Sequence, residues 1–378
     1  MTAWAVVENG ADLQPIEPAV PVPAGTEVLI EVTHCGVCHS DLHIWDGYYD
    51  LGGGARMSLK DRGVKLPLVM GHEVVGRVAA LGPDAVGVAV GDVRIVFPWL
   101  GCGQCAECRA ERDNMCVTAS RSIGIFQPGG YGTHVVVPHP RHLVDPGTLD
   151  LAVAATYACS GVTVYSAIRK VLPLPPEEPV VIVGAGGLGL NAIHVLRALG
   201  HQAIVVVDID PAKREAALAA GATAVVDASG EGVTDRILAA CGGPVLAVID
   251  LVNGTATATF ALAALRKGGT LVQVGLFGGD MRVPLPPMVM KALTIRGSYV
   301  GNPVELRELV ALAQNGRVPP LPVTTLPKSQ ANTALHRLRE DAGAPSRLLP
   351  IQGRDHFSIL DELQSPTGTL SLAARTLA

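Results

Sequence analysis

The sequence predicts an α/β protein in which a doubly wound parallel sheet is joined to a second, mostly antiparallel β domain. Up to about residue 150, short β-branched runs alternate with Gly and Pro. From there to about residue 296, strand and helix patterns alternate, which is typical of a parallel sheet covered by helices on both faces. At 378 residues the chain is long for one domain and short for three, so two domains are expected.

Composition narrows the class of protein further. Aromatic residues make up only 4%, beside 43 Gly and 28 Pro, and this mixture favours short strands and turns over a helical bundle. The net charge of −5 and the absence of a Lys/Arg-rich run argue against nucleic acid or an anionic membrane as a partner. Because the N-terminus lacks the pattern of a signal peptide, we expect a cytoplasmic protein whose eight cysteines bind metal or stay free thiols.

The expected elements follow this order along the chain. In the first part, the runs that read as strands are "EVLIEV", "HEVVGRVAAL", "DVRIVFP" and "THVVVP". Near residue 151 the pattern changes to a long, alanine-rich helical segment, "LAVAATYACSGVTVYSAIRKVL". The alternating region then begins with "VVIVGAG", whose glycines, with Asn191 and His194 beyond them, favour a buried strand and helix over a membrane span. Past residue 296 come two amphipathic helices, and the stretch from 351 to 378 has no clear period.

The glycine-rich segment "VVIVGAGGLGLNAIHVL" predicts a dinucleotide site. Gly184, Gly186 and Gly189 have G-x-G-x-x-G spacing between a strand and a helix, a context that lets the backbone approach a pyrophosphate at the helix N-terminus. Gly187 and Leu188 belong to the same loop.

An acidic residue follows this loop at the end of the next strand, where it can select the cofactor. Asp208 lies 24 positions after Gly184 and can accept hydrogen bonds from the adenosine ribose while repelling a 2′-phosphate, so NAD is favoured over NADP. The residues directly after it, 209–211, include no arginine. Lys213 either reaches the same ribose or is an exposed helix lysine.

Four cysteines in C-x2-C-x2-C-x7-C spacing indicate a metal site. Four thiolates so close together can surround one tetrahedral Zn²⁺, whereas neighbouring disulfides two residues apart would be strained. An iron–sulfur cluster is the competing interpretation, but it more usually has another spacing and a proline after the fourth ligand. We therefore favour a structural zinc held by Cys102, Cys105, Cys108 and Cys116.

Four separated motifs occur in a fixed order: "CGVCHSDLH", "GHEVVG", the four-cysteine loop and "GAGGLG". In this combination the chain resembles the zinc-dependent alcohol dehydrogenases of the medium-chain dehydrogenase/reductase superfamily over about residues 3–350. The resemblance implies a GroES-like catalytic domain at 1–150, to which 297–350 returns, and a Rossmann NAD-binding domain at 151–296. The stretch 351–378 is expected to be a C-terminal tail without a counterpart in the family. The resemblance also implies NAD, two zinc ions per chain and reversible oxidation of a small alcohol to an aldehyde or ketone.

The resemblance assigns roles to residues that would not stand out alone. A catalytic zinc would be held by Cys38, His72 and Cys159, with Glu73 beside the metal and Asp41 orienting His72. Ser40 and His43 would relay the hydroxyl proton to solvent. The remaining assigned residues face the cofactor: His39 and Arg347 near the pyrophosphate, and Thr163 against the nicotinamide.

Several features leave alternatives open. The substrate could instead be a polyol or an amino alcohol, and a non-catalytic zinc- and NAD-binding sensor is a candidate of another class. The insertion at 51–66 either shapes the substrate entrance or is an ordinary surface loop. The apolar run that begins at "TLVQVGLFGG" predicts a sheet edge for a homodimer or, more strongly, a homotetramer. Of the remaining residues, we expect an apolar pocket lined by Trp45, Tyr48 and Trp99 and buried thiols at Cys35 and Cys241.

Overall fold

The computed structural model describes residues 1–118 and 121–341. The chain divides into two compact units, residues 1–334 and residues 335–378, and only the end of helix α11 (Ala331–Asp341) is described in the second. The account below concerns the first unit.

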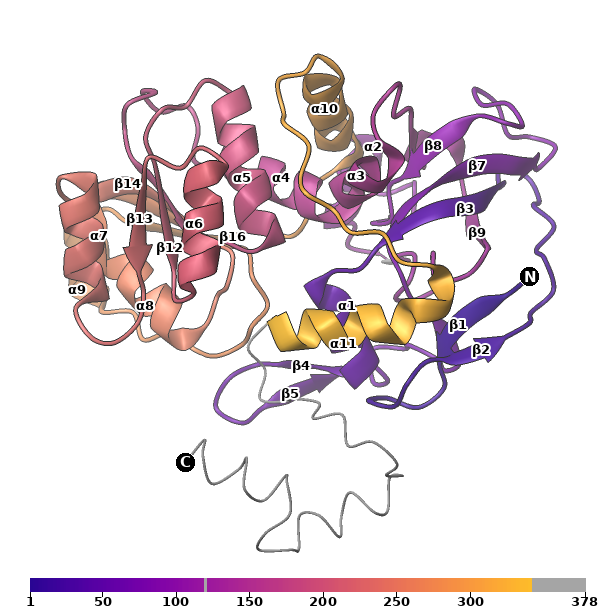
Figure 1. The fold of residues 1–378 in the computed structure, drawn as a ribbon, viewed down its shortest axis with the longest axis horizontal. Coiled ribbons are helices and arrows are strands. Elements are labelled where there is room, and N and C mark those ends of the chain that lie inside the picture. Colours follow the sequence, from indigo (N-terminus) through magenta and orange to yellow (C-terminus); the bar gives the residue numbers. More distant parts are fainter. Residues whose placement is uncertain (119–120, 342–378) are drawn as a thin grey trace, which may run out of the picture. The chain divides into compact units, whose positions relative to one another are not determined.

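A six-stranded parallel sheet forms the cofactor part of the molecule (Figure 1). Its order, β13-β12-β11-β14-β15-β16, starts from a central β11 and winds outward in both directions, which is the Rossmann topology. All four residues of β11 are buried, as expected for a strand covered on both faces. The strands are β11 (Val180–Val183), β12 (Ile204–Asp208), β13 (Ala224–Asp227), β14 (Val245–Asp250), β15 (Leu265–Gln273) and β16 (Thr294–Gly297).

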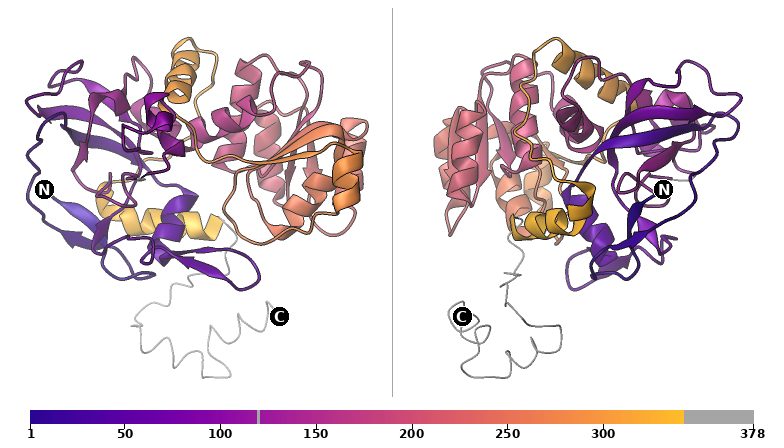
Figure 2. Two further views of the ribbon diagram at one scale, coloured as in Figure 1. Left: turned by 180° about the vertical axis from the view of Figure 1, so that it is seen from behind. Right: turned by 45° about the vertical axis from the view of Figure 1, so that its right-hand side comes forward.

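Helices connect these strands and cover the sheet (Figures 1 and 2). They are α5 (Gly187–Ala198), α6 (Pro211–Ala219), α7 (Val233–Cys241), α8 (Thr255–Ala263) and α9 (Leu285–Met290). An apolar core of Val, Ile, Leu, Ala and Phe side chains fills the space between the sheet and helices α7 and α8. The predicted α/β fold class is therefore confirmed for this part.

The N-terminal part is built on antiparallel strands, also as predicted. Its main sheet has the order β10-β8-β7-β3-β9, and a smaller sheet has the order β2-β1-β6. The strands are β1 (Ala3–Val6), β2 (Gln14–Ile16), β3 (Val28–Gly36), β6 (Leu68–Val69), β7 (Glu73–Leu81), β8 (Val93–Val96), β9 (His134–Val137) and β10 (Leu143–Val144). A separate hairpin pairs β4 (Tyr48–Asp50), directly before the 51–66 insertion, with β5 (Arg56–Ser58) inside it. The short helices are α1 (His39–Asp46) and α2 (Ala106–Arg109).

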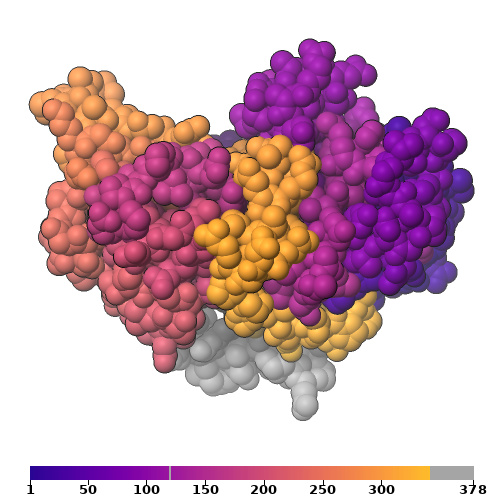
Figure 3. Space-filling model, turned by 90° about the horizontal axis from the view of Figure 1, so that it is seen from above, coloured from indigo at the N-terminus to yellow at the C-terminus, as the bar shows by residue number. Residues whose placement is uncertain are grey.

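One long helical segment connects the two parts. It consists of α3 (Leu151–Thr156), a π-helical turn (Tyr157–Gly161) and α4 (Val162–Arg169). This stretch of 19 residues is long and apolar enough to cross a membrane, with an 18-residue window of mean hydropathy 1.5. However, 83% of that window is buried inside the protein, as in a core helix. Helix α10 (Pro303–Gln314) packs on α4 and on the π-helical turn, and Figure 3 shows its segment between the two sheet-bearing parts.

Candidate active site

The structure gathers one cluster of potential metal ligands from three distant segments. The side chains of Cys38, His72, Glu73 and Cys159 place their ligand atoms within 4.8 Å of one another. The Sγ atom of Cys38 lies 3.0 Å from Nε2 of His72. His72, Glu73 and Cys159 are buried, and Cys38 is partly buried, so the cluster is largely withdrawn from water.

Local backbone features explain how each ligand reaches the cluster. Cys38 is the N-cap of α1, where its backbone N–H donates to Oδ2 of Asp41 at 2.9 Å. His72 follows Gly71, whose φ of +92° suits glycine, and a Cβ on Gly71 would lie 2.5 Å from the Tyr131 ring. Cys159 lies inside the π-helical turn, a distortion that often marks functional sites.

The carboxylate of Asp41 lies beside the histidine of this cluster. Its Oδ1 lies 3.4 Å from Nδ1 of His72, and both side chains are fully buried. With Nδ1 directed at a carboxylate, Nε2 is the nitrogen that faces the cysteines, as in the carboxylate–histidine pairs behind many metal sites.

The electrostatics of the cluster fit a bound cation. A hydrogen bond from Cys159 lowers the pKa of Cys38 well below its usual value, against the opposing effect of burial, so that Cys38 is readily a thiolate. Burial, reinforced by the Cys38 thiolate, raises the pKa of Glu73 well above its usual value. Anionic ligands collected in a buried place are stabilised by a positive ion among them, and two cysteines with one histidine are a donor set that zinc prefers.

The four cysteines of the second motif also come together as predicted. Cys102, Cys105, Cys108 and Cys116 place their sulfurs within 4.8 Å of one another, with separations that include 3.5, 3.9 and 4.0 Å. Sulfurs around a tetrahedral zinc, with bonds of about 2.3 Å, are about 3.8 Å apart. A disulfide needs about 2.05 Å, and all four cysteines are free, so the loop fits a closed zinc site and excludes paired disulfides.

Helix α1 places the predicted relay beside the first cluster. Ser40 is partly buried, and Nε2 of His43 is buried without a hydrogen-bond partner among the described residues. Ser40 and His43 have no direct hydrogen bond to each other in the described structure, so a bound molecule would have to complete the path. The His43 ring packs on Tyr49, with ring centroids 4.9 Å apart, and sequence reasoning missed Tyr49.

The aromatic residues around the cluster differ in part from the prediction. Trp45 was expected in the substrate pocket, and this is wrong: it is 1% exposed and its Nε1 donates to the carbonyl of Ala11. Trp99 does lie beside the cluster, with its ring 5.4 Å from that of His72. Tyr299, which the sequence did not single out, packs edge-on against Trp99 at 6.0 Å.

The other predicted aromatic and thiol positions are less enclosed than expected. The guanidinium carbon of Arg56 lies 4.1 Å from the centre of the Tyr48 ring, so the hairpin itself covers this ring. Cys35 and Cys241 are only partly buried, and the thiol of Cys35 packs close to Gly71.

The glycine loop has the geometry expected of a pyrophosphate site. Gly184 has a φ of +98°, and Gly189 lies so close to the Gly184 carbonyl that a side chain would overlap it. Gly186 caps the N-terminus of α5, and Gly186 and Gly187 both face open space, where a phosphate can approach the backbone. Leu188 is half-buried in the same turn.

Asp208 is placed at the end of β12, as predicted, and also holds the loop. Its Oδ2 accepts the N–H of Ala185 at 2.7 Å, and its Oδ1 accepts the N–H of Asp210 at 2.9 Å. This second role was not evident from the sequence. Residues 209–211 include no arginine, but the fold brings one to Asp208 from further along the chain, because Nη1 of Arg214 donates to the Asp208 carbonyl at 2.8 Å.

The other residues predicted to bind the cofactor come from separate segments of the chain. Thr163 is buried on α4, and its Oγ1 has no hydrogen-bond partner among the described residues. His39 is exposed, but the surrounding protein partly desolvates the ring and lowers its pKa, and the Lys213 ammonium acts in the same direction. Arg347 lies outside the described residues.

The insertion reaches from the antiparallel part to the cofactor part. A Cβ on Gly52 would lie 2.6 Å from the carbonyl carbon of Gly279, so the two backbones touch where side chains are absent.

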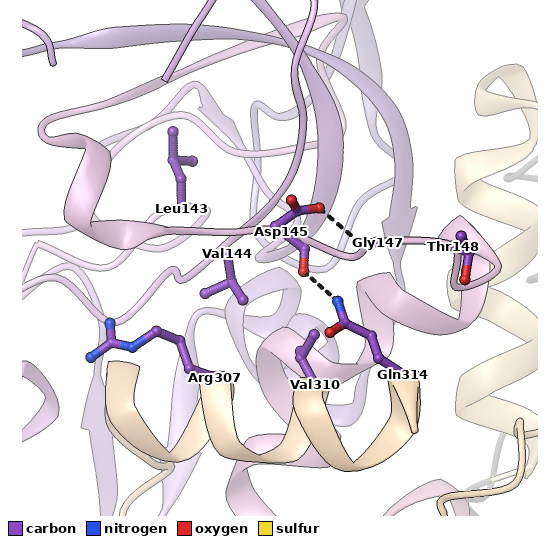
Figure 4. Close-up of a pocket in the computed structure, with 8 residues that line it drawn as sticks. All are labelled: Leu143, Val144, Asp145, Gly147, Thr148, Arg307, Val310 and Gln314. Atoms are coloured by element: carbon purple, nitrogen blue, oxygen red, sulfur yellow. Dashed lines mark hydrogen bonds between the residues drawn. The ribbon is translucent and has the colours of Figure 1, made fainter. Parts of the chain in front are cut away.

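A further surface depression of about 540 Å³ lies between α10 and the segment after β10 (Figure 4). The side chain of Gln314 crosses it to donate to the Asp145 carbonyl at 3.0 Å. It contains none of the predicted site residues, and it is lined by Leu143, Val144, Asp145, Gly147, Thr148, Arg307, Val310 and Gln314.

Known proteins share these features over nearly the whole chain. Residues 24–146 match the family described as "Alcohol dehydrogenase GroES-like domain", and residues 187–315 match "Zinc-binding dehydrogenase". The chain is 38% identical to the NAD-dependent alcohol dehydrogenase of Sulfurisphaera tokodaii over 340 residues, which cover 89% of this chain and 96% of that protein. The NAD-dependent alcohol dehydrogenase of Saccharolobus solfataricus is also 38% identical, over 342 residues, with coverage of 89% and 96%.

The same likeness is seen in three dimensions. The crystal structure of the alcohol dehydrogenase from Aeropyrum pernix has a TM-score of 0.81 and 30% identity, with 90% of this chain and 97% of that chain covered. The sequence matches, the two-part fold and the cysteine and glycine motifs thus agree. The chain belongs to the zinc-binding alcohol dehydrogenases of the medium-chain dehydrogenase/reductase superfamily and is an oxidoreductase.

Proposed function

We propose that the protein catalyses the reversible, NAD-linked oxidation of an alcohol to an aldehyde or ketone at the cluster of Cys38, His72 and Cys159. The observation that supports this most directly is the convergence of two cysteines and a carboxylate-oriented histidine in a buried cluster. In this proposal one zinc is bound there, with Glu73 beside it, and a second is bound by the four-cysteine loop.

The proposed chemistry divides between the metal, the cofactor and the chain. Zinc, when bound, supplies a Lewis acid that makes the substrate hydroxyl more acidic. Ser40 would take the hydroxyl proton and His43 would pass it outward, while Thr163 would pack against the nicotinamide, the group that supplies hydride chemistry when NAD is bound. The glycine loop, His39 and, outside the described residues, Arg347 bind the pyrophosphate, and Asp208 with Lys213 binds the adenosine ribose.

An absorbance assay of NADH formation tests the proposal directly. The purified protein is given NAD with a panel of primary, secondary, polyhydric and amino alcohols, and zinc is counted by elemental analysis. We expect turnover with at least one simple alcohol and two zinc ions per chain. NAD binding without turnover on the whole panel would favour the sensor interpretation instead.

Asp208 should make NAD the preferred cofactor. Its carboxylate can accept hydrogen bonds from the ribose hydroxyls, and it would repel a 2′-phosphate of nearly two negative charges. We expect a preference of at least ~100-fold in kcat/KM, or about 2.7 kcal/mol. Asp208→Gly should weaken NAD binding and also relieve the repulsion of NADP, so the ratio of the two kcat/KM values should fall. Because the residue also holds the Ala185 N–H, Asp208→Asn is the gentler variant, and equal use of NAD and NADP by the unmodified enzyme would contradict the role.

The edge of the cofactor sheet should form a subunit interface. Strand β16 ends the sheet, and Leu285, Val289 and Met290 on the adjacent α9 are 74%, 78% and 68% exposed. An exposed edge beside an apolar helix is suited to pairing with a second copy. Light scattering should give a homotetramer or a homodimer, and a monomer at micromolar concentration would refute this.

The cytoplasmic location and the domain limits expected from the sequence stay predictions.

A further inference from the structure

Two acidic residues stand side by side where the cofactor sheet meets the proposed ribose site. Asp208 ends β12 and Asp227 ends β13, and the two are register partners in neighbouring parallel strands. Arg214 lies against both of them. Its Nη1 donates to the Asp208 carbonyl at 2.8 Å and lies 3.2 Å from Oδ1 of Asp227.

The start of α6 explains why the arginine comes to this place. The side chain of Asp210 caps the helix by accepting the N–H of Ala212 at 2.8 Å, and Pro211 is the first helical residue. Arg214 therefore lies in the first turn, and its side chain reaches back over the end of β12. It is 17% exposed, whereas the Asp227 side chain is 44% exposed.

An arginine at this point bears on the choice of cofactor. In dinucleotide-binding folds, an acid at the end of the second strand binds the ribose of NAD, and an arginine nearby accommodates the 2′-phosphate of NADP. This chain has both. The acid alone therefore does not explain the expected selectivity, since a free guanidinium next to it would attract the phosphate.

We propose that Asp227 is a cofactor-specificity residue that withholds Arg214 from an adenosine 2′-phosphate. Its carboxylate holds the guanidinium at the end of the sheet and neutralises its charge. Selection against NADP then has two parts: Asp208 repels the phosphate, and Asp227 removes the cation that would bind it. The inference rests on the proposed NAD site and adds a residue to it.

Titration calorimetry with ADP-ribose and its 2′-phosphate tests the inference. These probes contain the adenosine ribose but no nicotinamide, so the measurement does not depend on turnover. Asp208→Asn serves as the background, because it removes the direct repulsion. Asp227→Asn is added to it, since asparagine can still accept the Ser229 N–H that Oδ1 of Asp227 now accepts at 2.9 Å.

We expect Asp227→Asn to strengthen binding of the 2′-phosphate probe by about ten-fold or more, the effect of one charge-assisted hydrogen bond, with little change for ADP-ribose. Adding Arg214→Gln restores the net charge of the background and should abolish the gain. Lys213 is present in every variant, so its contribution cancels.

A matched control separates the local ion pair from general charge. Asp235 is exposed on the next helix, α7, and Asp235→Asn removes the same charge without a contact to Arg214. It should leave the ratio of the two affinities within about two-fold, because exposed charges at a distance are screened by salt. The inference is wrong if Asp227→Asn gives no gain, if the gain survives Arg214→Gln, or if Asp235→Asn matches it. Failure of ADP-ribose to bind even the unmodified protein would instead overturn the proposed cofactor site.

Discussion

Replacing Cys38 with alanine should remove about one zinc per chain and nearly all alcohol oxidation. The Cys38 sulfur lies 3.0 Å from Nε2 of His72 and shares a buried cluster with Cys159 and Glu73, so its loss leaves too few ligands for tight binding. Elemental analysis and NADH absorbance measure the two effects on the same preparation.

Two further cysteines provide the controls for this experiment. Cys35→Ala removes a thiol three residues earlier in the sequence that is outside the cluster, and it should keep both zinc ions and most of the activity. Cys105→Ala should instead remove the other zinc and mainly lower the thermal stability, because a structural zinc contributes directly to folding. One zinc in the unmodified protein, or iron with visible absorbance, would contradict the two-zinc assignment.

His43→Ala should retain both zinc ions but slow turnover by about 10²- to 10⁴-fold, the range usual for general acid–base groups. Partial burial lowers the pKa of His43, so its ring is neutral at neutral pH and can accept a proton. The loss should be largest at lower pH, where solvent is the poorest alternative proton acceptor. The pH dependence of kcat for the two proteins measures this.

Tyr49→Phe is the matched control for His43. It keeps the ring that packs on His43 at 4.9 Å and should therefore keep the pH profile of the unmodified enzyme. A His43→Ala variant with unchanged turnover at every pH would mean that solvent reaches the substrate hydroxyl without the relay.

Much of the site could be predicted because its metal-binding and cofactor-binding residues lie at characteristic spacings within short segments of the chain. Four cysteines within fifteen residues predict one shared metal site, and the structure brings all four sulfurs together. The glycine loop is equally local, since Gly184 and Gly189 meet steric needs of one strand-to-helix turn, and Gly186 and Gly187 leave space for a phosphate. The cluster of Cys38, His72 and Cys159 is different, because its members come from distant segments and only the family resemblance connected them.

The features that the sequence did not reveal depend on contacts between residues far apart in the chain, or on which face of a helix a side chain occupies. Trp45 was placed in the pocket, yet it lies two residues after His43, about 200° around the axis of α1, and therefore faces the core. The contact between Arg214 and Asp227 depends on the register of β12 and β13 and on the first turn of α6, and neither can be predicted from the local sequence. Tyr299 contacts Trp99 although the two residues are 200 positions apart in the sequence, and no local sequence pattern predicts this contact.

The π-helical turn has a consequence for the rotational phase of the segment Leu151–Arg169. Helix α3 packs on β3 and β7 of the antiparallel part, and α4 packs on α5 of the cofactor part. One residue corresponds to about 100° of rotation in an α-helix, so the wide turn resets the angle between these two contact faces. Deleting one residue here would restore a regular helix and turn α4 by that angle relative to α3. Either Cys159 would leave the metal cluster or one domain would lose its packing face. The irregular turn therefore allows one continuous helical segment to place Cys159 and to pack on both parts of the protein.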